Sequence, residues 1–303
     1  MSFMRLTNLR LRAKIMLAVR SFFDDRGFLE VETPLRIPAN APEEHINPFE
    51  SEKWFLHTSP EMCMKRLLSR GYGNIYQICH CWRSSERGTR HLPEFTMLEW
   101  YRAKGDYHDL MRDCEELLKW LAKGDWTEAG NELPNNIRAA FGNVAEQISV
   151  EEAFDRYASM GMQTAMHRGV FDEIMVTLIE PSLPRNRPVI LKDYPAEMAA
   201  LARLKQGDPT VAERFELYVN GLELANGFSE LIDPTEQRER FMEANCRRSQ
   251  AGVPTLPLPE PFLGDLATMQ PAAGIALGVD RLVMLLCGAE RIDEVVSFTP
   301  EEL

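Results

Sequence analysis

Apolar residues recur at helical spacing in several parts of the chain. Between residues 9 and 23 they fall on one side of a helix that Gly27 ends, and they are Leu9, Leu11, Ile15, Leu17, Val19, Phe22 and Phe23. A second helix is predicted for residues 61–69, because Ser59-Pro60 places a proline at its first turn. Three more helices are predicted, at residues 106–123 with Asp106 as the cap, at residues 234–250 and at residues 278–287.

Shorter runs rich in β-branched and aromatic residues alternate with turn signals and predict strands. The runs are residues 28–33, 74–82, 94–101, 189–191, 214–219 and 222–231, with a hairpin turn signal at Asn220-Gly221. Residues 34–51 and 251–261 are predicted loops, and residues 124–186 have weak patterning with several helices. Strands in hairpin-like succession with helices grouped around them predict an antiparallel sheet in an α+β fold. Without repeats or linkers, the sequence favours one domain over residues 1–303.

The composition is that of an ordinary globular protein, with 303 residues, 45% hydrophobic and 26% charged. The formal net charge of −12 argues against a surface that wraps nucleic acid. The basic start runs into an amphipathic helix rather than an apolar segment, so no signal peptide is predicted. No apolar run approaches about 18 residues, so no membrane span is predicted either. We therefore expect a cytoplasmic protein.

The six cysteines lie in periodic segments, and we expect them to be reduced packing residues. They are Cys63, Cys79, Cys81, Cys114, Cys246 and Cys287. Cys79 and Cys81 form a C-x-C pair, but no second pair follows at zinc-finger spacing.

An arginine-rich loop lies between two of the predicted strands. Arg83, Arg87, Arg90 and His91 crowd this loop, and guanidinium groups match phosphate oxygens, so the loop suits a polyphosphate. Taken alone, it is also typical of a solvated hairpin tip.

Two other segments carry candidate chemistry. In residues 274–282, small residues alternate before Arg281, which opens a helix whose N-terminal end favours anions. The same string is typical of an ordinary helix start. Glu216, Glu223 and Glu230 are spaced around the hairpin turn, where carboxylates would hold Mg²⁺ or an ammonium. Surface acids are the alternative.

Together and in this order, these segments resemble class II aminoacyl-tRNA synthetases, and the lysyl branch in particular. Residues 28–34 (FLEVETP) are similar to motif 1, residues 83–95 followed by TMLEWY to motif 2, and residues 278–286 to motif 3. ELANGFSEL at residues 223–231 is similar to the amino-acid segment of lysyl-tRNA synthetases. The resemblance implies a class II synthetase-type antiparallel sheet flanked by helices, and a homodimer formed through motif 1.

The resemblance also implies an ATP site and a Mg²⁺ site. Arg83 would contact the α-phosphate, Arg281 and His91 the outer phosphates, and Phe95 would stack on adenine. The residues expected at ATP are Arg83, Ser84, Ser85, Glu86, His91, Leu92, Phe95, Glu223, Leu224, Gly278 and Arg281, with Arg83 and Arg281 as the catalytic pair. Glu216 and Glu223 would bind Mg²⁺.

The amino-acid site follows from the same resemblance. Glu61 would take one amino group, and Glu230 with Tyr101 would grip the terminal ammonium. The residues expected at the amino acid are Ser59, Pro60, Glu61, Glu99, Tyr101, Asn226, Glu230 and Ala276. The reaction would be positional and electrostatic, with the substrate carboxylate attacking the α-phosphorus and no protein nucleophile.

The first predicted helix begins by about residue 9, which leaves no room for an anticodon-binding domain before motif 1. This pattern resembles the truncated lysyl-tRNA synthetase paralogues that transfer (R)-β-lysine to a lysine of elongation factor P. Ser59 and Ala276 replace residues that tend to be Ala and Gly in lysyl-tRNA synthetases, consistent with a reshaped substrate pocket. Elongation factor P is therefore the expected partner and lysine or β-lysine the expected substrate, with tRNA disfavoured. A tRNA-charging catalytic core and a non-catalytic sensor are the alternatives.

The chain also departs from the family pattern at two places. The usual Arg-x-Glu string of motif 2 is absent, because Ser85 stands where the acid is expected and Glu86 follows one place later. Leu92 replaces an Asn expected after His91. Both positions lie near adenine in the family, so we expect rearranged contacts with the base.

Overall fold

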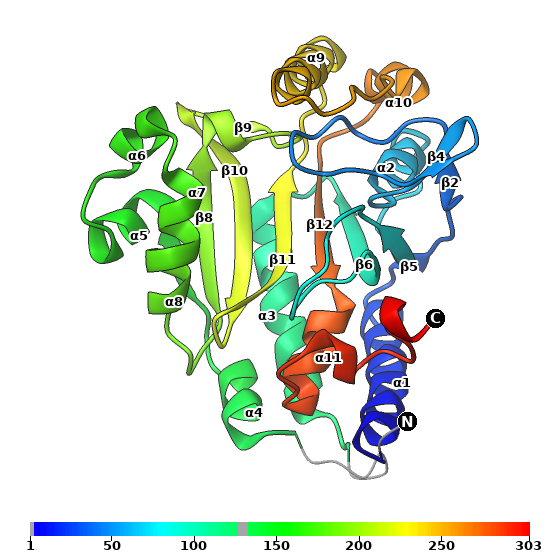
Figure 1. Cartoon of the computed structure of the whole chain (residues 1–303), viewed down its shortest axis with the longest axis vertical. Helices are drawn as coiled ribbons and strands as arrows, with labels where there is room; N and C mark the ends of the chain where they lie inside the picture. The colour runs from blue at the N-terminus through cyan, green and yellow to red at the C-terminus, as the bar shows by residue number, and fades with distance from the viewer. Residues whose placement is uncertain (1–2, 127–132) are drawn as a thin grey trace.

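The computed structural model describes residues 3–126 and 133–303, so residues 127–132 of the weakly patterned stretch lie outside it (Figure 1). The described residues form a nine-stranded sheet in the order β1-β5-β6-β12-β11-β10-β8-β7, with β9 paired to β10. Its strands are β1 (Leu29–Glu30), β5 (Ile75–Trp82), β6 (Glu94–Ala103), β7 (Glu146–Ser149), β8 (Val189–Pro195), β9 (Leu204–Lys205), β10 (Asp208–Val219), β11 (Leu222–Ser229) and β12 (Ala272–Gly278). A separate small sheet consists of β2 (Arg36–Ile37), β3 (Glu50–Ser51) and β4 (Trp54–Leu56).

The helices surround this sheet. They are α1 (Phe3–Asp24), α2 (Glu61–Ser69), α3 (Tyr107–Lys123), α4 (Asn135–Gly142), α5 (Val150–Tyr157), α6 (Met162–Arg168), α7 (Phe171–Ile174), α8 (Glu180–Ser182), α9 (Pro234–Gln250), α10 (Glu260–Leu266) and α11 (Val279–Cys287). The shorter turns are η2 (Met175–Ile179), a π-helix, and the 3₁₀ turns η3 (Ala196–Met198), η4 (Ile292–Glu294) and η5 (Pro300–Glu302). No helix within the described ranges is both long and apolar enough to cross a bilayer.

The main hydrophobic core lies where α1, α3, α4 and α11 pack against one face of the sheet. A second cluster joins α5, α6, α7 and η2 to β8. Side chains alternate across a strand, so Ile190 of β8 belongs to the main core while Val189 and Leu191 belong to the second cluster. Helices α5, α6 and α7 with η2 therefore pack on the opposite face of the sheet from α3, whereas α4 of the same weakly patterned region packs with α3.

Several predicted elements are confirmed. α2 and α9 occupy the predicted residues, and Asp106 caps α3 by accepting hydrogen bonds from the backbone N–H groups of His108 and Asp109. The β10–β11 hairpin turns at Asn220 and Gly221, both with positive φ, as the sequence signal requires. The α+β class is confirmed too.

Other expectations were wrong in detail. The first helix begins at Phe3 rather than residue 9, because Arg5 and Asn8 are held by the C-terminal segment. The strand predicted at residues 28–33 contains only Leu29 and Glu30, since the chain leaves the sheet before Pro34, which has no N–H to donate. Residues 34–51 are not only loop, because they contribute β2 and β3.

The sheet itself differs from the expected one in two ways. It is mixed rather than purely antiparallel, since β1–β5 and β7–β8 are parallel pairs. The sequence prediction also missed β12, a central strand whose residues are mostly small, and α11 begins directly after it. Small side chains carry little strand preference, and the place of β12 between β6 and β11 is decided by packing.

All six cysteines are free. Five are buried or partly buried as expected, but Cys246 is exposed on α9.

Candidate active site

A pocket of about 650 Å³ opens on the face of the sheet opposite α1 and α3, within the size range of small-molecule sites. Strands β6, β11 and β12, the β5–β6 loop and the starts of α2 and α11 all contribute to it. Sixteen of the expected site residues line it: Ser59, Glu61, Arg83, Ser85, Glu86, His91, Leu92, Phe95, Glu99, Tyr101, Glu223, Leu224, Asn226, Ala276, Gly278 and Arg281. Segments far apart in the sequence thus meet at one cavity.

Four expected residues do not line the cavity. Pro60 is the N-cap of α2, and the Ser84 N–H donates to the Asn47 carbonyl at 2.7 Å. The Glu216 carboxylate is hydrogen-bonded to Arg214, Tyr194 and Tyr218 and does not line the cavity. Glu230 lies beneath Gly274 and is 1% exposed.

Arginines occupy one end of the pocket. Arg281, at the start of α11, donates from Nη1 to the Glu223 carboxylate at 3.1 Å and to the Glu223 carbonyl at 2.9 Å. Its Nη2 contacts His91 Nε2, and burial, with the nearby arginines, lowers the pKa of His91. The guanidinium carbon of Arg83 lies 5.2 Å from the centroid of the Phe95 ring. This end of the pocket presents cations and a neutral imidazole, which suits an anionic ligand.

Asp280 fixes the start of α11 in place. It accepts a hydrogen bond from Arg12 Nη1 of α1 at 2.5 Å and one from the Thr96 N–H of β6 at 2.7 Å, and it is 2% exposed. Arg281 follows Asp280 directly, so these bonds aim the arginine at the pocket. The sequence showed the Asp-Arg pair but not this role.

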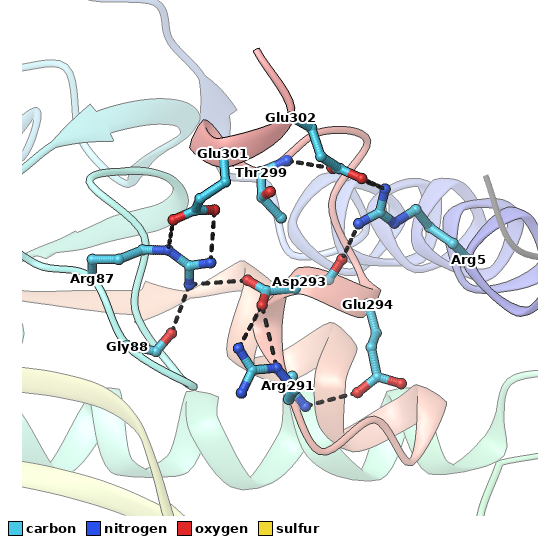
Figure 2. Close-up of polar contacts among 9 residues, drawn as sticks. All are labelled: Arg5, Arg87, Gly88, Arg291, Asp293, Glu294, Thr299, Glu301 and Glu302. Carbon is cyan, nitrogen blue, oxygen red and sulfur yellow. Dashed lines mark hydrogen bonds and ion pairs between the residues drawn. The ribbon is translucent and has the colours of Figure 1, made fainter.

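The arginine-rich loop is tied to the C-terminal segment, which lies beside α1 (Figures 1 and 2). Arg87 Nε and Nη2 donate to Glu301 at 2.8 and 3.0 Å, and its Nη1 lies 3.0 Å from Asp293 (Figure 2). Arg87 was grouped with the candidate phosphate cations, but both carboxylates already occupy its guanidinium. It stabilises the loop instead.

The opposite end of the pocket is acidic and holds an ammonium of the protein itself. Lys65 Nζ, 1% exposed, lies 2.5 Å from a carboxylate oxygen of Glu61 and 2.5 Å from one of Glu230. The Tyr101 hydroxyl donates to Glu99 Oε1 at 2.6 Å. Oε1 of Glu230 is buried with no hydrogen-bond partner in the described structure.

These acids are not balanced by Lys65. Burial raises the pKa of Glu230 to about 8 and holds that of Glu99 well above its usual range. Burial and the charge of Glu61 raise the pKa of Glu43 to about 7. Burial acts to lower the pKa of Lys65, but Glu230 and Glu61 outweigh it and raise this pKa, so Lys65 stays charged. Lys65 contacts only Glu61 and Glu230 of these carboxyl groups, so the site would gain from further positive charge.

Glu216 and Glu223 differ as candidate Mg²⁺ ligands. Glu223 faces the cavity with its carboxylate bonded only to Arg281 in the described structure. Glu216 accepts hydrogen bonds from the Tyr194 and Tyr218 hydroxyls, both at 2.7 Å, and from Arg214 at 2.6 Å. Glu223 therefore fits a Mg²⁺ bound with phosphate, whereas Glu216 would have to exchange one of these bonds.

A model of the family described as tRNA synthetases class II (D, K and N) matches residues 4–302. The chain belongs to this class II synthetase family. It is 40% identical to the elongation factor P–(R)-β-lysine ligase of Histophilus somni strain 2336, over 96% of this chain and 94% of that one. It is 39% identical, with the same coverage of both chains, to the proteins of that name from Edwardsiella ictaluri and Salmonella gallinarum.

The family assignment and these relatives confirm the expected ligase with a class II synthetase catalytic domain. The structure adds three residues to the candidate site that the sequence analysis missed. They are Lys65, Glu43 and Asp280. One signal was available for Lys65, because it follows Glu61 by four residues on α2.

Gly274 of β12 is expected to tolerate no side chain. A Cβ there would lie 2.2 Å from Tyr101 Cε1 and 2.6 Å from Glu230 Oε1. Gly274→Ala should therefore lower the free energy of unfolding by about 1–3 kcal/mol, measured by urea denaturation. Gly264→Ala on α10, where a Cβ would meet nothing within 4 Å, is the matched control and should be neutral or slightly stabilising. Equal stability of the two variants would contradict this close packing.

Proposed function

We propose that this class II synthetase activates (R)-β-lysine or lysine with ATP as an aminoacyl-adenylate, with release of pyrophosphate. It then transfers the aminoacyl group to the amino group of a lysine of elongation factor P, with release of AMP. The observation that supports it best is the polarity of the pocket, with arginines at one end and surplus carboxylates at the other. The curated relatives described above carry the name of this activity. We place the reaction in the cytoplasm. We also propose that the described residues form one catalytic domain.

The acidic end favours an amino acid with two ammonium groups. Lysine and β-lysine each carry two, and the carboxyls of Glu43, Glu99 and Glu230, whose pKa values are raised by burial, would ionise more readily beside an added ammonium. In the proposed pose, Glu61 binds one amino group. Oε1 of Glu230 and the Glu99–Tyr101 pair receive the terminal ammonium.

The arginine end holds the nucleotide in this proposal. Arg83 binds the α-phosphate and stabilises charge as the substrate carboxylate attacks phosphorus in line. Arg281 and His91 hold the departing pyrophosphate, and Phe95 stacks on adenine. Glu223 would hold Mg²⁺, with Glu216 as a second ligand after it exchanges one of its present hydrogen bonds, and the ion would neutralise phosphate charge. No side chain forms a covalent intermediate, so the protein contributes position and electrostatics.

A direct assay tests the acceptor. Purified protein, ATP and labelled (R)-β-lysine are incubated with elongation factor P or with bulk tRNA. We expect label on elongation factor P and ATP–pyrophosphate exchange that depends on the amino acid. Label on tRNA alone would replace the proposal with tRNA charging, and absence of exchange with every lysine-like acid would favour a sensor.

Glu230 is expected to control recognition of the amino acid rather than of ATP. Removing one partner of an enclosed ammonium–carboxylate pair costs about 2–5 kcal/mol, so Glu230→Gln should raise the KM for the amino acid by at least about 30-fold. The KM for ATP should change little. Glu239→Gln, on the exposed side of α9, is the control. Equal loss for both substrates would argue against the role given to Glu230.

The pH dependence follows from the same carboxyl. Only the ionised form attracts an ammonium, and the pKa of Glu230 is raised to about 8. The affinity of the free enzyme for the amino acid should therefore increase as pH rises from 7 to 8.5. Steady-state kinetics would measure kcat/KM over this range, and the Gln variant should have a flatter profile. An identical profile in the two proteins would exclude Glu230 as the titrating group.

We also propose that the protein is a homodimer. Two apolar side chains are exposed, Leu17 of α1 at 60% and Leu29 of β1 at 50%. Leu29 lies in the segment similar to motif 1, and Leu17 lies on the helix that precedes it. Introducing Glu at both positions should give a monomer in sedimentation velocity at micromolar concentration. Val176→Glu, at an apolar position equally exposed on η2, is the control. A parent protein that sediments as a monomer would refute the dimer.

A further inference from the structure

Two cysteines and a histidine come together one strand away from the amino-acid end of the pocket. Cys79 and Cys81 are two residues apart on β5, so their side chains lie on one face of the sheet. Cys79 is paired with Met97 of the neighbouring strand β6. His57, just after β4, reaches the same point, and it is 1% exposed.

The separations of their potential ligand atoms are close to those of a metal site. The two sulfur atoms lie 3.9 Å apart, and His57 Nε2 lies 3.8 Å from each of them. In a tetrahedral zinc site, with Zn–S bonds of about 2.3 Å and Zn–N bonds of about 2.0–2.1 Å, ligand atoms are about 3.5–3.8 Å apart. A shift of a few tenths of an ångström in the sulfur atoms, with a turn of the His57 ring, would bring all three atoms into bonding distance of one ion.

We propose that His57, Cys79 and Cys81 form a binding site for one Zn²⁺ ion, with a fourth position left for water. Among the histidine, cysteine, aspartate and glutamate side chains of the described ranges, these three form the one cluster whose ligand atoms are close enough to hold a metal ion. This site is separate from Glu216 and Glu223, which the proposed activation reaction assigns to Mg²⁺.

The surroundings favour a soft cation over a hard one. Cys81 Sγ also lies 3.9 Å from Met97 Sδ, so sulfur atoms are concentrated around this point. Thiolate and imidazole ligands select zinc, whereas Mg²⁺ prefers oxygen ligands. Cys81 and His57 are fully buried, and Cys79 is partly buried, so a bound ion would be largely shielded from water.

Binding exchanges existing contacts for metal bonds. His57 Nε2 lies 2.7 Å from the carbonyl of His80, to which the ring donates when this nitrogen carries the proton. To bind zinc, Nε2 must lose that proton and turn toward the sulfur atoms. Zinc binding should therefore release protons and strengthen with pH, as expected for thiolate and imidazole ligands.

Metal binding to the purified full chain tests the proposal. The protein is reduced, freed of metal by a chelator, and titrated with Zn²⁺ against a chromophoric competitor. We expect one Zn²⁺ per chain that excess Mg²⁺ does not displace. Co²⁺ in place of Zn²⁺ should give the strong visible bands of a tetrahedral ion and a sulfur-to-cobalt charge-transfer band.

Variants identify the ligands. Cys79→Ser and Cys81→Ser should each weaken zinc binding by at least about 100-fold, and His57→Asn by at least about 10-fold. Cys246→Ser and Cys63→Ser, which alter cysteines outside the cluster, should bind zinc as the parent does. The unfolding midpoint of each metal-free variant shows whether it is folded before its affinity is compared.

Two results would overturn the site. One is a parent protein that binds no Zn²⁺ more tightly than its Cys79→Ser/Cys81→Ser double variant. The other is a folded His57→Asn variant with the parent's affinity and cobalt spectrum, because the three-ligand assignment would then fail.

Discussion

The ammonium of Lys65, buried between the carboxylates of Glu61 and Glu230, is the interaction on which the acidic end of the site depends. A buried charge is costly unless it is paired, and each of these groups would be unstable at its place without the others. The arrangement also links α2 to the end of β11, because Glu61 and Lys65 come from the helix and Glu230 directly follows the strand. Lys65 thus holds together the two elements that form the acidic end of the pocket.

The pocket is polarised along its length because its two ends are built from different parts of the sheet. Arg281 lies in the first turn of α11, which follows β12, and Arg83 directly follows β5, so both arginines line the same end of the pocket. Asp280 is bonded to Arg12 and Thr96, which fixes the start of α11. Arg87 is bonded to the C-terminal segment, which fixes the arginine-rich loop (Figure 2). These contacts hold the cations in place, and such preorganisation is what electrostatic catalysis requires.

Small residues allow this site to exist. Gly274 is opposite Tyr101 in the sheet register, and the side chains of Tyr101 and Glu230 occupy the space above its Cα. Ala276 and Gly278 continue the same face of β12 and leave the floor of the cavity open. A strand of larger residues would pack better as a strand but would fill the pocket.

The sequence by itself determined the helices with strong periodicity and caps, the β10–β11 hairpin, and the residues that meet at the arginine end. These features depend on local signals, such as the Asp106 cap and Asn220-Gly221, or on motifs that keep their order in the chain. Only the tertiary structure decided the place of β12, the parallel edge strands and the pairing of Lys65 with Glu230. Their causes are packing and long-range charge, because a central strand of small residues has no local preference and Lys65 meets Glu230 only when α2 packs beside the sheet.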